Sequence, residues 1–443
     1  MKHSIVFHNT QSYLSVLAAM ILLQPFLSCQ LYSHETEQEQ TVNIVHYGPT
    51  AVPDRIVLTW TGDPATSQAV TWRMDRDAAR VVAEIVLAED GPKFAGKAKQ
   101  VAATSQELDA ALGSALYHTA NFTGLQPKTK YVYRVGGGAH WSEWSHFTTA
   151  AREPEPFTFV YFGDAQNDIK SMWSRVVREA YADAPRAAFL LHAGDLVNNA
   201  NSDAEWGEWF YAASHIHRTI SCIATPGNHE YSDGALSKHW RPTFAFPENG
   251  PKGLEETVYT IDYQNVRIIS LNSMRQVEEQ KRWLTDVLSD NKNLWTIITF
   301  HFPIYSAGAD RDNPDLRNLW QPVFDRFKVD LVLQGHDHTY ARSGLRTHEN
   351  VATGVTAQSP AAGTVYVVSV SGPKMYTLKP LPDMKRVAAN TQLYQIITID
   401  GNELHYQAHT ATGKPYDGFT LHKRKGQPNQ LIEKIPNTPE RRE

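Results

Sequence analysis

Five short polar clusters hold the residues of this chain that are best suited to metal chemistry. Each cluster follows an apolar run, and together they supply two aspartates, one asparagine and three histidines: Asp164, Asp195, Asn228, His301, His336 and His338. Nitrogen and oxygen donors without a thiolate suit Zn, Mn or Fe at two neighbouring centres, and they argue against a structural zinc site. Two cations roughly 3.5–4 Å apart can hold a hydroxide and clamp a phosphoryl group during in-line displacement. The sequence therefore predicts two metal ions in one site.

The apolar runs before these clusters are predicted strands. FTFVYF precedes Asp164, AAFLLHA precedes Asp195 and LWTIITF precedes His301. Amphipathic segments with apolar residues at helical spacing alternate with them, at 171–184, 278–291 and 313–328. This alternation predicts a layered α/β core, in which ligands bind beyond the carboxyl ends of the strands. We therefore expect the five clusters to converge in one cleft.

Residues 52–149 have a different pattern. Short alternating runs such as RIVLTW, QAVTWRM and KYVYRV are separated by turn signals, which predicts an antiparallel β-sandwich. The stretch GLQPKTKYVYRV, which contains Tyr131, is similar to the tyrosine-corner region of fibronectin type III domains. No cluster of His, Asp and Glu falls in this region, so we expect a structural or recognition module.

The two ends of the chain are expected to lie outside the folded domains. Lys2 and the apolar run 13–28 predict a leader over 1–29, followed by a polar tether over 30–51. FLSC resembles a bacterial lipoprotein cleavage box, so either a lipidated Cys29 holds the protein at a membrane surface or the protein is simply secreted. Both alternatives place it outside the cytoplasm, in the medium, the periplasm or the bacterial cell envelope. We expect a catalytic domain over 155–425 and a charged tail over 426–443.

Charge and cysteine content narrow the possible partners. The net charge is −5 and no basic stripe is present, so nothing indicates a nucleic-acid partner. Apart from Cys29, the only cysteine is Cys222, which lies in an apolar run and is expected to be a buried thiol. His215 and His217 precede this run and are expected at the surface.

The ordered motifs GD, GD, GNHE, H and GHDH resemble those of the calcineurin-like metallophosphoesterases. RIVLTWTGDPATSQAVTWR and GHDHTYAR look like segments of plant and bacterial purple acid phosphatases, so the resemblance spans about 52–425. It implies a fibronectin type III-like domain followed by an α/β metallophosphoesterase domain with a central β-sandwich flanked by helices. The first metal would take Asp164, the bridging Asp195 and His338, and the second would take Asp195, Asn228, His301 and His336.

His229 would face the phosphate according to this resemblance. It would donate a hydrogen bond to the developing oxyanion or protonate the leaving oxygen. The alternative is that His229 holds Asp195 in place.

Two positions of the first metal site depart from the family pattern. Purple acid phosphatases have a tyrosine that binds ferric iron and gives the colour, and Asn198 stands there in this chain. Other metallophosphoesterases have a metal-binding histidine where this chain has Gln166. An amide oxygen of Gln166 or Asn198 can replace these ligands. Because an amide is a weaker donor, the first metal should bind more loosely or be a harder ion such as Mn²⁺.

The substrate side of the site departs as well. Purple acid phosphatases carry a histidine pair where this chain has Asp310 and Arg311, of which Arg311 can grip a phosphate bidentately. Asn199, Tyr305 and Tyr340 are further candidates to line the cleft.

The resemblance implies a binuclear phosphoesterase that hydrolyses small-molecule phosphomonoesters, like an acid phosphatase, through a hydroxide held by the two ions. Phosphodiester hydrolysis is the alternative within this family, because the histidine pair that grips monoesters is missing. A third reading belongs to another class: a non-catalytic surface lipoprotein that binds glycans or partners through its β-domain.

Overall fold

A computed structural model describes residues 46–77, 81–309, 311–348, 362–379 and 384–443. The predicted leader, Cys29 and most of the tether lie outside these residues. Residues 49–443 form one compact unit. None of the helices that the structure describes is both long and apolar enough to cross a bilayer.

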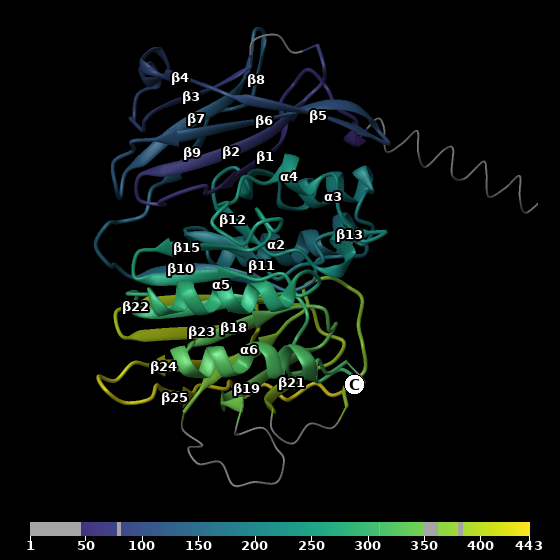
Figure 1. Cartoon of the computed structure of the whole chain (residues 1–443). Coiled ribbons are helices and arrows are strands. Elements are labelled where there is room, and N and C mark those ends of the chain that lie inside the picture. The colour runs from purple at the N-terminus through teal and green to yellow at the C-terminus, as the bar shows by residue number, and fades with distance from the viewer. Residues whose placement is uncertain (1–45, 78–80, 310, 349–361, 380–383) are drawn as a thin grey trace, which may run out of the picture. The chain divides into compact units, whose positions relative to one another are not determined.

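The first part of this unit is an all-β sandwich, as the alternating pattern predicts (Figure 1). In the described part of the chain, one sheet has the order β1-β2-β6-β5, and the other has the order β4-β3-β7-β8 with β9 added to β7. The strands are β1 (Asp54–Thr59), β2 (Ser67–Met74), β3 (Val82–Leu87), β4 (Lys99–Ala102), β5 (Thr104–Ala110), β6 (Gly113–Thr123), β7 (Lys130–Gly137), β8 (His140–Trp141) and β9 (Ser145–Thr148). A 3-10 helix, η1 (Pro92–Lys97), precedes β4.

The expected tyrosine corner is present in this sandwich. The backbone N–H of Gln126 donates to the hydroxyl of Tyr131 over 2.9 Å. The Tyr131 ring stacks on Phe147, with ring centroids 5.7 Å apart, inside a core that also contains Trp72 and Phe122. The hydroxyl thus fixes the turn before β7 while the ring fills the space between the sheets.

Two larger sheets form the α/β part of the described chain. One has the order β12-β11-β10-β22-β23-β24-β25, and the other has the order β15-β16-β17-β18-β20-β19-β21. Their strands are β10 (Phe157–Phe162), β11 (Phe189–His192), β12 (Ser221–Ala224), β15 (Tyr259–Tyr263), β16 (Val266–Ser270), β17 (Trp295–Thr299), β18 (Leu331–Gln334), β19 (Tyr340–Arg346), β20 (Thr364–Val368), β21 (Met384–Ala388), β22 (Leu393–Asp400), β23 (Glu403–Thr410), β24 (Pro415–His422) and β25 (Gln430–Glu433). A short hairpin of β13 (Tyr231–Ser232) and β14 (Ala235–Leu236) follows β12.

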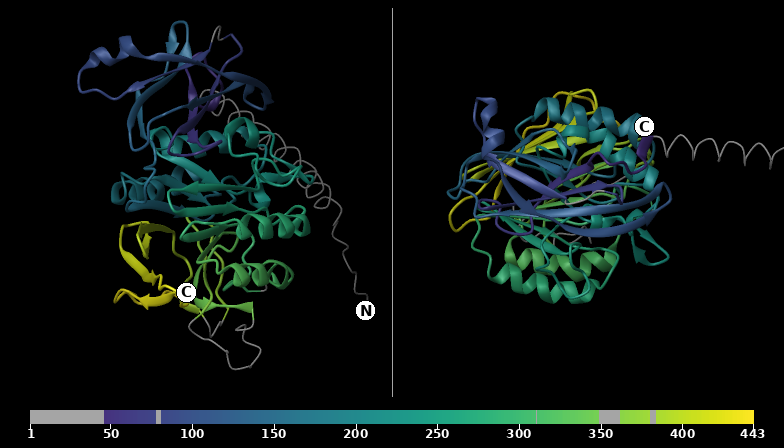
Figure 2. Two further views of the ribbon diagram at one scale, coloured as in Figure 1. Left: turned by 60° about the vertical axis from the view of Figure 1, so that its left-hand side comes forward. Right: turned by 90° about the horizontal axis from the view of Figure 1, so that it is seen from above.

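The two sheets bury one core between them, and helices cover their outer faces. Phe159 and Leu191 of the first sheet belong to the same apolar cluster as Ile297 and Leu333 of the second. The helices are α2 (Ser174–Asp183), α3 (Asp203–Ala213), α4 (Trp240–Thr243), α5 (Val277–Ser289) and α6 (Pro314–Phe327). α2 packs on β22 and on α3, whereas α5 and α6 lie side by side over the second sheet (Figures 1 and 2). The predicted central sandwich flanked by helices is therefore confirmed.

The three amphipathic segments form the expected helices with one irregularity. α2 is preceded by a π-helical turn, η2 (Ile169–Trp173), which begins after Asp168 in a left-handed conformation with φ 46°. π-Turns of this kind occur frequently at functional sites. Here η2 follows directly on the first polar cluster. Two 3-10 turns, η3 (Ser214–Ile216) and η4 (Asn228–Glu230), complete the elements.

Two expectations about the edges of the fold are wrong. His217 is fully buried and stacks on Trp209 with ring centroids 4.1 Å apart, although His215 is exposed as predicted. The charged tail is also part of the fold, because β25 pairs with β24 and Arg441 pairs with Ala388. Cys222 is buried, as expected.

Candidate active site

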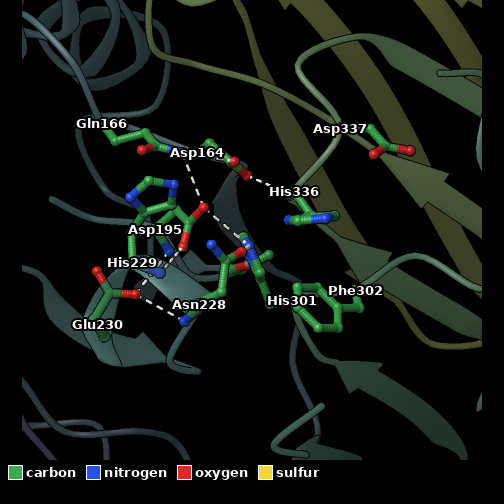
Figure 3. A network of polar contacts seen from close by, with 12 residues as sticks. Asp164, Gln166, Asp195, Asn228, His229, Glu230, His301, Phe302, His336 and Asp337 are labelled. Atoms are coloured by element: carbon green, nitrogen blue, oxygen red, sulfur yellow. Dashed lines mark hydrogen bonds and ion pairs between the residues drawn. The ribbon is translucent and has the colours of Figure 1, made fainter. Parts of the chain in front are cut away.

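The five polar clusters emerge from one edge of the α/β core. β10, β11 and β12 are parallel neighbours, and Asp164, Asp195 and Asn228 follow their carboxyl ends. β17 and β18 are parallel neighbours in the other sheet, and they lead to His301 and to His336 with His338. Since the carboxyl ends of parallel strands meet at one edge, the loops bring these side chains together. Figure 3 shows Asp164, Asp195, Asn228, His301 and His336 gathered there.

The loops that carry these residues need unusual backbone conformations. Asp195 and His336 are both in the left-handed region, with φ 50° and 72°. Gly194 also has a positive φ of 89°, and a Cβ there would meet Nδ1 of His301 at 2.6 Å. Non-glycine residues adopt this region rarely, and such strained residues cluster at functional sites.

Asp195, His301, His336 and Asn228 form the first group of close donors. Oδ2 of Asp195 lies 3.0 Å from Nε2 of His301, which lies 3.1 Å from Oδ1 of Asn228. Ligand atoms of Asp195, His301 and His336 all lie within 4.8 Å of one another. His301 Nδ1 donates to the carbonyl of Ala193 over 2.8 Å, so the lone pair of Nε2 points at the other donors.

Asp164, His338 and Gln166 form the second group around the same Asp195. Nε2 of His338 lies 3.3 Å from Oδ2 of Asp164, and its Nδ1 donates to the carbonyl of Lys374 over 2.8 Å. The side-chain amide of Gln166 is buried among these residues. Its Nε2 lies 2.9 Å from Oδ2 of Asp195 and 3.1 Å from Nε2 of His338.

The other amide atom of Gln166, Oε1, has no hydrogen-bond partner in the part of the chain that the structure describes. Rotating the amide by 180° exchanges Oε1 and Nε2. The oxygen then faces Asp195 and His338, where it is able to coordinate a cation. The geometry thus accommodates Gln166 as a ligand of the first metal.

Asn198, the other candidate ligand, has different contacts. Its backbone carbonyl accepts a hydrogen bond from Nδ1 of His229 over 2.6 Å, and its backbone N–H donates to Glu205. Asn198 also lines a cavity of about 540 Å³ together with Asn167 and Tyr211. Among the described residues, no hydrogen bond joins its side chain to Asp164 or Asp195.

Burial makes both carboxylates hard to charge without cations. Burial raises the pKa of Asp164 to about 8, opposed by His301 and reinforced by the neighbouring Asp195. Burial also raises the pKa of Asp195 to about 6. The histidines are affected in the opposite sense, because burial lowers the pKa of His338 to about 3 and that of His336 well below its usual range. Buried carboxylates beside neutral imidazoles are what a pair of cations requires, so the residues fit two metal ions.

His229 contacts the site through its backbone and keeps its ring partly exposed. Its N–H donates to Oδ1 of Asp195 over 2.9 Å, and Nδ1 is fixed by the carbonyl of Asn198. The backbone of His229 therefore holds Asp195, which is the role that the alternative interpretation gave to His229. The ring remains able to face a substrate through Nε2.

Glu230 is a positioning residue that sequence reasoning missed. Its buried carboxylate accepts hydrogen bonds from the backbone N–H groups of Asp195 and Leu196 over 2.8 Å each, of Gly227 over 2.7 Å and of Val197 over 3.3 Å. One side chain thus ties the loop of the bridging aspartate to the loop of Asn228. The only signal in the sequence is the glutamate of GNHE itself.

Arg311 lies beside the site, but its guanidinium already forms hydrogen bonds within the protein. Its Nε donates to Asp337 over 2.5 Å and its Nη2 donates to the carbonyl of His336 over 3.2 Å. Asp337 is fully buried and also accepts from the hydroxyl of Ser306. Asp337 therefore orients Arg311. Asp310 lies outside the described residues.

Two of the three further cleft candidates lie elsewhere. Tyr305 is buried against α6, where its hydroxyl donates to Gln321 over 2.9 Å. Tyr340 is buried as well, and it donates to Asp417 over 2.6 Å. Asn199 is exposed and binds Glu205. The expectation that Tyr305 and Tyr340 line the cleft is wrong.

Two family models match the chain. Residues 53–149 match the purple acid phosphatase N-terminal domain, and residues 157–340 match the calcineurin-like phosphoesterases. These matches cover the sandwich and most of the α/β part, including all five polar clusters.

Several curated proteins, two of them named as acid phosphatases, are also similar in sequence to the chain. Acid phosphatase type 7 of Mus musculus is 26% identical over 330 residues, which cover 66% of this chain and 71% of that protein. Purple acid phosphatase 1 of Ipomoea batatas is 26% identical, with 52% of each chain covered. An uncharacterized protein of Mycobacterium tuberculosis is 28% identical over 51% of this chain and 50% of its own length. The chain thus spans about half the length of the first relatives.

A solved structure shares the fold. The purple acid phosphatase PPD1 from yellow lupin (Lupinus luteus) seeds superposes with a TM-score of 0.70 at 19% identity, covering 84% of this chain and 74% of that one. The chain therefore carries a purple acid phosphatase N-terminal domain at residues 53–149, followed by a calcineurin-like phosphoesterase domain at residues 157–340.

Proposed function

We propose that this protein hydrolyses small-molecule phosphomonoesters with two bound metal ions, in the manner of an acid phosphatase. The observation that carries the proposal is the gathering of Asp164, Asp195 and His301 with the other nitrogen and oxygen donors at one edge of the core. The relatives named acid phosphatases support the choice of substrate class.

Each ion would have four protein donors. Asp164, Asp195, His338 and Gln166 would hold the first, and Asp195, Asn228, His301 and His336 would hold the second. When bound, such ions supply Lewis acidity toward phosphoryl oxygens and lower the pKa of a bound water toward 7. Activity therefore does not require an acidic medium.

The protein's own residues position the reaction and supply a proton. The carbonyl of Asn198 accepts from Nδ1 of His229, so Nε2 is the ring atom left to face the substrate. When the ring is an imidazolium, Nε2 can pass its proton to the leaving oxygen of the ester, which leaves a neutral imidazole. Glu230 keeps the two loops that carry Asp195 and Asn228 at a fixed separation.

Phosphodiester hydrolysis is the second candidate. The observation in its favour is that Arg311 is committed to Asp337 and that no histidine pair stands beside it. A diester carries one charge fewer than a monoester, so it needs fewer cations around the phosphoryl group.

The test compares p-nitrophenyl phosphate with bis(p-nitrophenyl) phosphate after loading with Mn, Zn or Fe. We expect turnover with at least one metal and a preference for the monoester. Preference for the diester would select the second candidate. Turnover of neither ester with any of the three metals would contradict both, and would favour a non-catalytic binding protein.

We further propose that the protein acts outside the cytoplasm, either secreted or held at the bacterial envelope by a lipidated Cys29. The apolar run before Cys29 supports this proposal. The test is detergent-phase partitioning of the full chain and of a Cys29→Ala variant from cell fractions. Lipidation predicts that only the wild type enters the detergent phase, and simple secretion predicts that neither does. Recovery of both in the cytoplasm would contradict extracytoplasmic placement.

A further inference from the structure

A sixth loop also reaches the metal-ligand cluster. Its sequence contains no His, Asp, Glu or Cys that would mark it as a metal-binding loop. β20 runs parallel to β18, so the segment 369–377 that follows β20 emerges at the same edge as the GHDH loop. The backbone N–H groups of Ser371 and Gly372 donate to the carbonyl of Asp164 over 3.0 and 2.6 Å. A Cβ on Gly372 would meet the carbonyl oxygen of Gln166 at 2.5 Å. The segment is therefore packed tightly against the first polar cluster.

This packing fixes Lys374 and Tyr376 beside His338. The carbonyl of Lys374 accepts from Nδ1 of His338 over 2.8 Å, and the N–H of Tyr376 donates to the carbonyl of His338 over 3.0 Å. The rings of Tyr376 and His338 have centroids 4.7 Å apart. Nζ of Lys374 lies 5.6 Å from the Tyr376 ring centroid. The ammonium group of Lys374 therefore lies over a ring that contacts His338, beside the donors of the first metal position.

Lys374 differs from Arg311 because Arg311 forms an ion pair with Asp337, whereas Lys374 forms none with the residues that the structure describes. The guanidinium of Arg311 lies 4.8 Å from the centroid of the same Tyr376 ring, but it is bound to Asp337 and to the carbonyl of His336. Within the ranges that the structure describes, no carboxylate forms an ion pair with Lys374 and no hydrogen bond involves its ammonium group. An ammonium group whose contact is an aromatic ring, with no carboxylate to neutralise it, favours an incoming anion.

We propose that Lys374 binds the phosphoryl oxygens of the substrate and sets the preference for phosphomonoesters over diesters. This inference rests on the proposed function. A monoester carries close to two negative charges at neutral pH, whereas a diester carries one. An extra cation therefore stabilises the monoester more, and Lys374 takes over the role that the missing histidine pair cannot fill. Tyr376 limits the directions that the flexible lysine stem can take.

The experiment compares Lys374→Met, which removes the charge, with Lys374→Arg, which keeps it. Lys385→Met is the matched control, because Lys385 is an exposed lysine on β21. For each metal-loaded protein, kcat/KM is measured near pH 7.5 with p-nitrophenyl phosphate and with bis(p-nitrophenyl) phosphate. Binding of inorganic phosphate is measured by calorimetry, and bound metal is quantified to verify equal loading.

We expect Lys374→Met to lower kcat/KM for the monoester about tenfold and for the diester less than about threefold. Phosphate binding should weaken about tenfold, Lys374→Arg should restore most of both losses, and Lys385→Met should match the wild type. Equal losses for the two esters, or unchanged phosphate binding in Lys374→Met, would overturn the proposal.

Failure of the proposed function would look different. If the wild type hydrolyses neither ester, the assignment as a phosphoesterase fails, and calorimetry still decides the role of Lys374. Phosphate binding that depends on Lys374 would then support the anion site alone. No detectable phosphate binding by the wild type would overturn it.

Discussion

The side-chain amide of Gln166 lies 2.9 Å from the carboxylate of Asp195, inside the group of donors around the first metal position. Asn198 occupies the place where purple acid phosphatases carry a tyrosine ligand, but it contacts His229 and Glu205 through its backbone. Of the two amides that can complete the donor set of the first metal, Gln166 is therefore the one in contact with Asp195 and His338. This relationship makes the first metal position open to direct tests.

Changing Gln166 should alter the affinity for the first metal. Gln166→His should tighten binding because imidazole is the stronger donor, and Gln166→Ala should weaken it by about tenfold or more. Chelator competition with Mn²⁺ and Zn²⁺ measures both effects. Asn198→Ala is the matched control and should leave the affinity within about threefold of the wild type. A larger loss in Asn198→Ala than in Gln166→Ala would reverse the assignment.

Replacing His229 should slow the reaction according to the leaving group. We expect His229→Gln to lose about a hundredfold in kcat for alkyl phosphates, whose leaving oxygen needs a proton, and clearly less for p-nitrophenyl phosphate. Metal content should stay at the wild-type value, because the backbone N–H of His229 still binds Asp195. Equal losses for both leaving groups would argue that His229 only holds the loop.

Replacing Glu230 should destabilise the protein and loosen the metal site together. In Glu230→Gln, the amide NH₂ would face backbone N–H groups that now donate to a carboxylate oxygen. Leaving buried donors unpaired costs about 1–3 kcal/mol in the free energy of unfolding. Urea denaturation and metal titration measure the two effects. Glu279→Gln, at an exposed position on α5, is the control and should change neither; unchanged stability in Glu230→Gln would contradict the anchoring role.

Stability should fall in acid because of two buried histidines. His192 and His217 lie among Phe162, Trp173 and Trp209, and their ring nitrogens have no hydrogen-bond partner among the described residues. Burial lowers the pKa of His192 to about 3 and that of His217 well below its usual range. The unfolded chain binds these protons near pH 6.5, so stability is complete above that pH and declines as the pH falls toward 3.

Each such histidine should cost about 1.4 kcal/mol of unfolding free energy per pH unit below about 6.5. Urea denaturation at several values between pH 7 and pH 4.5 measures the slope. His217→Phe keeps the stacking on Trp209 and should reduce the slope of unfolding free energy against pH, because only His192 then contributes. His215→Gln, which changes an exposed histidine two residues away, should not. An unchanged slope in His217→Phe would show that other groups cause the acid sensitivity.

The metal-ligand candidates were predictable from the sequence because their residue types are chemically specific. Asp164, Asp195 and His301 each end an apolar run, and parallel strands bring such ends to one edge whatever the details of the packing. The sandwich and its tyrosine corner were predictable for a similar reason, since alternation and turn signals are local.

The remaining features depend on tertiary contacts that leave no local pattern. Glu230 has its role because it contacts the backbone of Asp195 and Gly227, and Lys374 because it lies beside His338. A single glutamate or lysine in a loop sequence does not reveal such contacts. The sequence predicts Tyr340 in the cleft and His217 at the surface, yet the packing of distant segments buries both side chains. Arg311 was expected to be free for phosphate, but Asp337 binds it in the folded chain.

The most direct test of the central claim is the metal content and turnover of Asp195→Asn beside the wild type. Asp195 contacts both donor groups, through His301 and through Gln166. We predict two ions per wild-type chain with hydrolysis of p-nitrophenyl phosphate, and a loss of bound metal with at least about a hundredfold lower turnover in the variant. Near-wild-type turnover by Asp195→Asn would contradict the account.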